Sequence, residues 1–178
     1  MSRPILVAGF PRSGTHFVQS LLSGYGREVL RWTIGSPVWH PAFEDVDLVF
    51  VERKDHKAMV MSHFLAMQTH VWESGVETEP MVFPLDMLDE AAHGTAEAQD
   101  REMRVAAEKF GAKIAVYESL AFSPGARQAL VQRVLGEGVV PRESVSEPYP
   151  RKVRVLNYDE VAEWYGHIPR GLIPAEPC

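Results

Sequence analysis

The sequence holds a single cysteine, Cys178, so no disulfide can form within the chain. Chains without disulfides are typical of reducing compartments, and we expect a cytoplasmic protein. No apolar run approaches the length of about 20 residues that a membrane-spanning helix needs, and we expect no association with a membrane. We also expect no secretory signal, because the apolar stretch at residues 5–8 is short and is soon followed by Pro11 and Arg12.

Positive charge is also scarce in this sequence. Lys and Arg number 18 against 24 Asp and Glu, which gives a formal net charge of −6 at pH 7. This balance argues against broad binding to nucleic acid. Any site for an anion must therefore be a local pocket that gathers a few cations. The 178 residues suffice for one hydrophobic core, and we expect a single domain over residues 1–178.

Residues 4–22 carry the clearest local pattern in the chain. A short apolar, β-prone run at residues 5–8 is followed at 9–15 by turn-forming and small residues. Apolar residues then recur at helical spacing over 17–22, so the pattern predicts a buried strand, a tight loop and an amphipathic helix. Such a loop directs backbone N–H groups and the positive end of a helix at one place, which favours an oxyanion.

Gly9 and Gly14 have the spacing of the ATP-type phosphate loop G-x-x-x-x-G-K-[ST], but the lysine of that motif is lacking. Thr15 and His16 follow the second glycine, and the cation comes earlier, at Arg12. The usual ligand of a nucleotide-bound magnesium is therefore missing, and the loop suits an anion held by Arg12 and backbone amides. ATP-type phosphate transfer and an ordinary strand-turn-helix corner stay open as alternatives.

The segment from Pro11 to Thr15, PRSGT, resembles the 5′-phosphosulfate loop of sulfotransferases that use 3′-phosphoadenosine 5′-phosphosulfate (PAPS). The resemblance covers residues 4–136 and is weaker toward the C-terminus. It implies a P-loop-type α/β fold and a metal-independent transfer of the sulfuryl group from PAPS to a hydroxyl or amine of a small-molecule or carbohydrate acceptor, with PAP as product. In the loop it assigns PAPS binding to Arg12, Ser13, Gly14, Thr15, His16 and Phe17.

Arg53 directly follows the strand predicted over 47–52, and Ser62 lies on the helix predicted over 56–70. In the resembled family, a strand-end arginine and a later serine bind the 3′-phosphate of PAPS, so the resemblance assigns this role to Arg53 and Ser62. A phosphate dianion suits a bidentate guanidinium and a short hydroxyl donor. A surface charge cluster at the start of a helix is the alternative.

His40 lies in a loop before the strand at 47–52, where the family has a histidine that takes the proton from the acceptor hydroxyl. An imidazole suits this role because its unperturbed pKa lies near neutrality. Some members use a glutamate, for which Glu44 is the local candidate, and a structural role for His40 is the alternative. The resemblance gives Arg12, with the amides of residues 13–16, the other catalytic role, which is to stabilise negative charge on the oxygen shared with the leaving PAP.

Two further segments resemble the family. Residues 116–120 resemble its Tyr-Glu-Asp-Leu strand, which implies that Tyr117 packs on the adenine. Arg151 and Lys152 resemble a C-terminal Arg-Lys-Gly segment that adds cations around the 3′-phosphate, with Val153 in place of the glycine. A half-buried Tyr117 without a ligand role and a solvated surface for the two cations are the alternatives.

His56, His63 and His70 are spaced by seven residues and share one face of a helix. This spacing does not by itself bring three ligands within reach of one ion, so we expect no metal site. The better hypothesis is a polar face, on which His63 or His70 lines the acceptor cleft.

Strand patterns alternate with helical patterns along the chain, which predicts an α/β fold with a mostly parallel sheet between two layers of helices. The predicted strands cover 5–8, 28–32, 47–52, 113–117 and 153–156. After the first helix, the predicted helices cover 56–70, 89–110, 124–135 and 158–165. Whether the helix at 89–110 is broken at Gly94 stays open. Residues 71–88 are predicted to form an irregular excursion and residues 166–178 an irregular tail. Ligands of such folds bind at the carboxyl ends of the strands.

Two functions from other classes stay open beside sulfuryl transfer. One is a nucleotide-dependent kinase or NTPase of the same fold, and the other is a non-catalytic relative that holds PAP or another anion. We expect PAPS or PAP and an unidentified acceptor as partners.

Overall fold

The computed structural model describes residues 2–34, 45–69, 79–142, 153–166 and 172–175. The chain divides into two compact units. The first, here called the sheet unit, contains residues 1–55 and 97–147, and the second unit contains residues 56–96 and 148–178. The assignment of the whole chain to one sulfotransferase-like domain stays a prediction.

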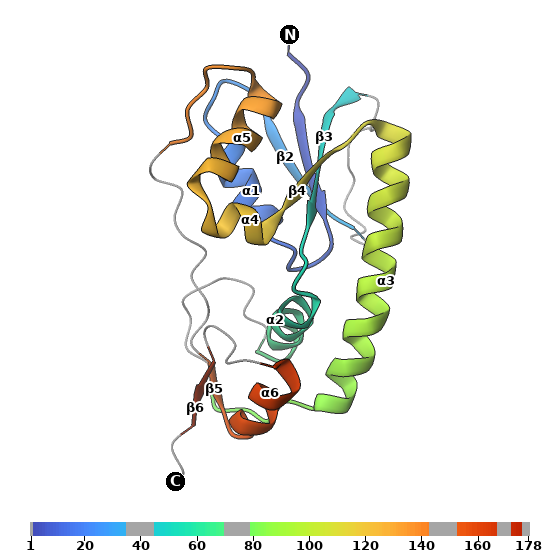
Figure 1. Cartoon of the computed structure of the whole chain (residues 1–178), viewed down its shortest axis with the longest axis vertical. Coiled ribbons are helices and arrows are strands. Elements are labelled where there is room, and N and C mark those ends of the chain that lie inside the picture. The colour runs from blue at the N-terminus through green and yellow to red at the C-terminus, as the bar shows by residue number, and fades with distance from the viewer. Residues whose placement is uncertain (1, 35–44, 70–78, 143–152, 167–171, 176–178) are drawn as a thin grey trace. The chain divides into compact units, whose positions relative to one another are not determined.

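Four parallel strands form the sheet of the first unit, in the order β2-β1-β3-β4 (Figure 1). Their bounds are Ile5–Gly9 for β1, Val29–Thr33 for β2, Asp47–Glu52 for β3 and Lys113–Val116 for β4. Ile5 of the central strand β1 stands opposite Val29 of β2 on one side and opposite Asp47 of β3 on the other. This sheet, flanked by helices, confirms the predicted α/β class.

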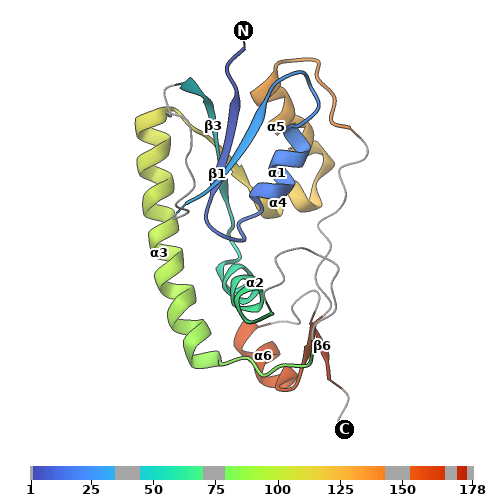
Figure 2. The same cartoon turned by 180° about the vertical axis from the view of Figure 1, so that it is seen from behind.

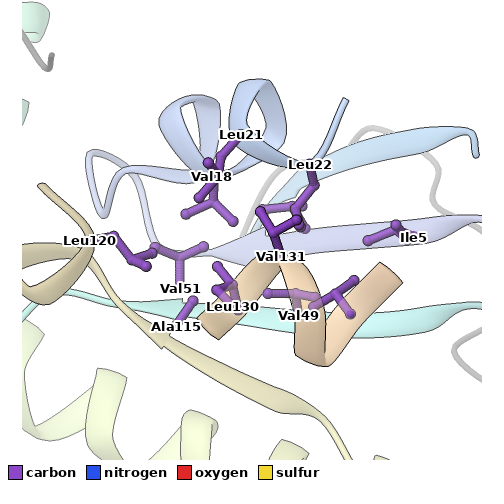
Figure 3. Packing of buried hydrophobic residues seen from close by; sticks show 12 residues of the cluster. Ile5, Val18, Leu21, Leu22, Val49, Val51, Ala115, Leu120, Leu130 and Val131 are labelled. Atoms are coloured by element: carbon purple, nitrogen blue, oxygen red, sulfur yellow. The ribbon is translucent and has the colours of Figure 1, made fainter. Parts of the chain in front are cut away.

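Successive side chains of the central strands point to opposite faces of the sheet, and both faces are covered. On one face, Ile5, Val49 and Val51 pack with α1 (Thr15–Leu22) and α5 (Pro124–Leu135), as Figure 3 shows. On the other face, Leu6 and Phe50 pack with Met103, which lies on α3 (Leu85–Phe110). Seen from behind, α1 and α5 lie on one side of β1 and α3 on the other (Figure 2). The sheet unit therefore has three layers.

Helices α1 and α5 begin and end as their sequences predict. The Ser123 hydroxyl accepts the N–H of Ala126 at 3.2 Å, and Pro124 occupies the first turn, which together cap α5 at its N-terminus. Gly24, with φ 84°, follows the end of α1. In the described ranges, no helix has both the length and the hydrophobicity to cross a bilayer.

Helix α3 corrects the last part, residues 85–88, of the stretch predicted to be irregular over 71–88. It begins at Leu85 and continues through Gly94 without a break. Leu88 and Ala92 recur at helical spacing and are buried, so packing stabilises the first turns. A glycine inside a helix costs only about 1 kcal/mol, which a helix of 26 residues tolerates.

The second unit contains α2 (His56–Thr69), α6 (Tyr158–Tyr165) and two parallel strands, β5 (Val153–Val155) and β6 (Leu172–Pro174). Its core includes Leu65, Phe83, Val155, Val161 and Leu172. Strand β6 corrects the prediction of an irregular tail over 166–178 at residues 172–174. The prolines of this stretch argued against a strand in the sequence. Pro174 is nevertheless compatible with the edge position of β6, and Leu172 is buried opposite Val153.

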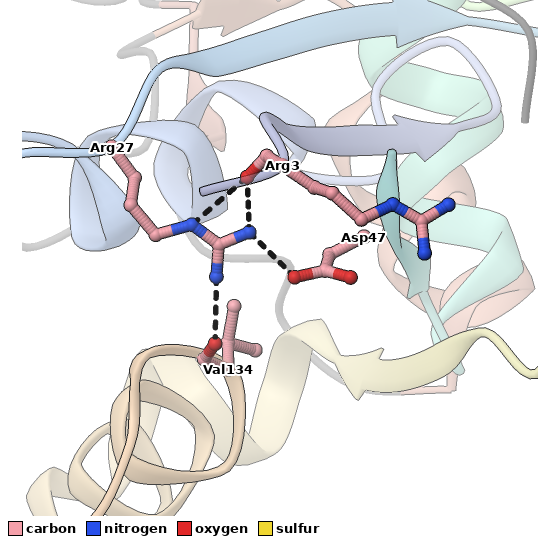
Figure 4. Close-up of polar contacts among 4 residues, drawn as sticks. All are labelled: Arg3, Arg27, Asp47 and Val134. Carbon is pink, nitrogen blue, oxygen red and sulfur yellow. Dashed lines mark hydrogen bonds and ion pairs between the residues drawn. The ribbon is translucent and has the colours of Figure 1, made fainter. Parts of the chain in front are cut away.

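Arg27 joins three elements of the sheet unit, as Figure 4 shows. Its guanidinium donates to the carbonyl oxygen of Arg3 before β1, at 3.0 Å from Nε, and to the carboxylate of Asp47 at the start of β3, at 2.5 Å. It also donates to the carbonyl oxygen of Val134 on α5, at 3.2 Å. Only 16% of the Arg27 side chain and 31% of the Asp47 side chain are exposed, so the ion pair is partly shielded from water.

We predict that Arg27→Ala lowers the free energy of unfolding by about 1–3 kcal/mol, because two carbonyls and a carboxylate lose their shared donor. Urea denaturation of the purified protein measures this change. Arg31→Ala is the matched control, since Arg31 is an exposed arginine on β2. Equal losses in the two variants would contradict a stabilising role for Arg27.

Candidate functional site

The loop between β1 and α1 has an unusual backbone. Arg12 has φ 65° and Gly14 has φ 98°, and Arg12 is the only non-glycine residue of the described chain with a positive φ. The Ser13 N–H donates to the carbonyl oxygen of Phe10 at 3.1 Å, which closes a tight turn. Gly14 at the N-cap of α1 offers no side-chain acceptor, so the first N–H groups of the helix are available to an anion.

Ser13 and Gly9 lie in close contact at the base of this loop. The Ser13 side chain is fully buried, and its Oγ has no hydrogen-bond partner among the described residues. A Cβ added to Gly9 would come within 2.5 Å of that Oγ and 3.0 Å of the Val51 carbonyl oxygen, so only glycine fits there. Leaving a buried hydroxyl unpaired costs about 1–3 kcal/mol, and an anion in the loop would supply the missing acceptor.

Arg53 follows β3 and reaches back to the loop. Its NH1 donates to the carbonyl oxygen of Arg12 at 2.9 Å, which stabilises the left-handed conformation of that residue. The guanidinium carbon lies 5.1 Å from the centre of the Tyr117 ring, in a cation–π contact. Only 17% of the Arg53 side chain is exposed. A second cation is thus held beside the loop by contacts with the loop itself and with Tyr117, which follows β4.

Tyr117 packs against both the loop and the helix that follows it. Its ring meets the edge of Phe17 at a centroid distance of 6.1 Å and an interplanar angle of 83°. A Cβ added to Gly14 would lie 2.8 Å from Cε2 of Tyr117 and closer still to Cδ2. The predicted ligands at positions 12, 14, 17, 53 and 117 therefore lie together, although they are far apart in the sequence.

Burial raises the pKa of the Tyr117 phenol above its ordinary value of 10.0. The positive charges of Arg53 and Arg12 oppose this shift, and the negative charge of Glu118 adds to it. Tyr117 is therefore a neutral hydroxyl at physiological pH, and it contributes an aromatic surface and a hydrogen-bond donor rather than a charge.

The sequence predicts a strand through Tyr117, and this boundary is wrong. Strand β4 ends at Val116, and Tyr117 opens the short helix α4 (Tyr117–Phe122). Glu118, in the first turn of α4, accepts the backbone N–H groups of Lys54 and Asp55, each at 3.0 Å. These contacts between neighbouring segments favour the early helical turn.

Glu118 is a residue that sequence reasoning missed. The signal was a carboxylate two residues after β4, together with a cation directly after β3. Such a carboxylate and cation meet when the two strands are neighbours, as β3 and β4 are. The pairing of β3 with β4 could not be predicted from the sequence alone.

Two further predicted site residues, His16 and Ser62, lie on helices. His16 is exposed on α1, and Ser62 is half-buried on α2 in the second unit, so its role with Arg53 stays a prediction. The remaining candidates lie outside the described residues: His40, Glu44, Arg151 and Lys152.

The three histidines of the expected polar face are described in part. His56 and His63 lie on α2, and His70 is outside the described residues. Within the ranges that the structure describes, no group of three or more His, Cys, Asp or Glu side chains could hold a metal ion.

The fold and the loop define an α/β protein with a candidate anion site at the carboxyl end of its central strand. Comparison with family models, with curated proteins and with solved structures found no match to this chain.

We predict that Gly14→Ala destabilises the protein by more than Gly138→Ala does. Both glycines have similar φ angles, 98° and 88°, but a Cβ at Gly138 would meet nothing within 4 Å. The control therefore measures the backbone cost of about 1–3 kcal/mol alone, and the excess at Gly14 measures the contact with Tyr117. Thermal unfolding of the two variants gives the comparison. Equal losses would show that the Tyr117 ring does not restrict position 14.

Proposed function

We propose that this protein is a PAPS-dependent sulfotransferase whose β1–α1 loop binds the 5′-phosphosulfate of PAPS. The observation that carries the proposal is the contact of Arg53 with both the Arg12 carbonyl and the Tyr117 ring. Arg12, Arg53, the Tyr117 ring and the N-terminus of α1 therefore lie around one loop. Such a set of donors suits a nucleotide that carries several anionic groups.

The loop favours a metal-independent anion over magnesium-bound ATP. Thr15 and His16 stand where an ATP-type loop has its lysine and its magnesium-binding hydroxyl. The cation at Arg12 and the buried, unpaired Ser13 Oγ instead supply a guanidinium and a hydroxyl donor. Both groups fit a phosphosulfate.

The proposed reaction gives roles to the loop, to Tyr117 and to His40, and PAPS supplies its activated sulfuryl group. Arg12 and the amides of residues 13–16 stabilise the charge that grows on the oxygen of the leaving PAP. The neutral Tyr117 offers its ring to the adenine. His40 takes the proton from the acceptor hydroxyl, as the resemblance implies. Sulfuryl transfer then depends on positioning and charge neutralisation, which these groups provide without covalent help.

Arg53 keeps enough donors for a second task. A guanidinium has five N–H groups, and one of them is used on the Arg12 carbonyl. We propose that the remaining N–H groups of its two terminal nitrogens bind the 3′-phosphate, which distinguishes PAPS from ATP. The single cysteine makes the cytoplasm the proposed location.

We predict that Arg12→Ala lowers kcat/KM for sulfuryl transfer about 10²-fold, by analogy with the loss of one oxyanion donor. The assay follows radiolabelled sulfate from PAPS to a panel of hydroxyl and amine acceptors. Arg31→Ala, which removes an exposed arginine on β2, is expected to keep normal activity. Near-normal transfer by Arg12→Ala would contradict the role of its guanidinium.

We predict that Arg53→Ala weakens the binding of PAP more than that of AMP, because AMP lacks the 3′-phosphate. Isothermal titration of the wild type and the variant with both nucleotides measures the ratio of the two affinities. An unchanged ratio would contradict the 3′-phosphate assignment.

The same titration separates the rival functions. Tighter binding of magnesium-bound ATP than of PAP would favour a kinase or NTPase. Binding of PAP without transfer to any acceptor would favour a non-catalytic relative.

A further inference from the structure

Glu118 uses both of its carboxylate oxygens on the segment that follows β3. Oε2 accepts the N–H of Lys54 and Oε1 accepts the N–H of Asp55, each at 3.0 Å. Because the two bonds go to successive amides, the carboxylate restricts the backbone immediately after Arg53. Only 27% of the Glu118 side chain is exposed, so water competes weakly for these bonds.

The same carboxylate lies beside the Arg53 side chain. Its Oε1 is 3.9 Å from Nε of Arg53, which is an ion-pair distance and longer than a hydrogen bond. That Nε is buried and has no hydrogen-bond partner among the described residues, so the nearby negative charge compensates it. Glu118 therefore acts on both the backbone and the guanidinium of the Arg53 segment.

Arg53 transmits this restraint to the loop. Its NH1 donates to the carbonyl oxygen of Arg12, the one described non-glycine residue with a positive φ. A left-handed arginine needs support from its surroundings, because the conformation is unfavourable for residues with a side chain. The contacts thus form a continuous series from Glu118 through Arg53 to Arg12.

We propose that Glu118 is a positioning residue for the anion-binding loop. It holds Arg53 against the Arg12 carbonyl, and this contact stabilises the loop in the conformation that presents its amides. The effect on a nucleotide rests on the proposed function. The effect on the loop itself does not, because it follows from contacts within the sheet unit.

Glu118→Gln tests the proposal with little change in size. The amide keeps one oxygen and replaces the other with an NH2 group, which cannot accept an N–H. One backbone bond and the negative charge beside Arg53 are lost together. Glu137→Gln is the matched control, because Glu137 is an exposed glutamate of the same unit and its change removes the same charge.

We predict that Glu118→Gln weakens the binding of both PAP and AMP, that of AMP about tenfold, which is the order expected for a hydrogen bond to a charged group. The loss for PAP is at least as large, because Glu118 also holds Arg53, the proposed ligand of the 3′-phosphate. In the Arg53→Ala background, Glu118→Gln has little further effect, since the residue through which it acts is gone. Glu137→Gln leaves both affinities unchanged.

Amide hydrogen exchange of the protein without nucleotide gives a second readout. We expect faster exchange at residues 10–16 in Glu118→Gln than in the wild type, and no change in Glu137→Gln. If Glu118→Gln does not fold, Arg53→Lys tests the same series, because a single ammonium replaces the planar fork that contacts both Arg12 and Tyr117. Faster exchange in the same residues is expected there too.

The outcomes separate the two proposals. Faster loop exchange in a protein whose wild type binds neither PAP nor AMP would support the role of Glu118 and contradict the proposed function. Unchanged loop exchange, or additive losses of nucleotide affinity in the double variant, would overturn the role of Glu118.

Discussion

The parallel pairing of β1, β3 and β4 is the constraint on which the candidate site depends. Gly9 stands opposite Val51, and Glu52 stands opposite Val116. Because parallel strands end at the same edge of a sheet, the residues that follow them meet there. Arg12, Arg53 and Tyr117 are brought together by this register, and no local sequence motif joins them.

The sequence predicted most strands and helices of the described chain because their patterns are local. Strand β3 is an apolar run that begins and ends as expected, and Ser123 with Pro124 predicts the start of α5. The wrong boundaries depend on contacts with distant residues. Tyr117 is helical where Glu118 bonds to the backbone after β3, and β6 forms where Leu172 is buried beside β5.

The parts of the candidate site that are contiguous in the sequence were predictable, and those that meet only through strand pairing were not predictable from local patterns. Residues 11–17 are contiguous, and glycines, a cation and hydroxyls after an apolar strand indicate an anion loop on physical grounds. Arg53 and Tyr117 needed a resemblance to a known family, because only strand pairing brings them to the loop. Glu118 escaped both kinds of reasoning, since its partners are backbone amides, which every residue has.

Position 12 has a left-handed backbone, which favours glycine, and carries a guanidinium, which only arginine supplies. Glycine there would adopt φ 65° without strain and would be expected to make the folded protein more stable, but it would remove the guanidinium. Selection for thermal stability alone would thus favour loss of the cation, and selection for anion recognition would retain it. Under the proposed function, the guanidinium at position 12 is therefore kept at some cost in stability.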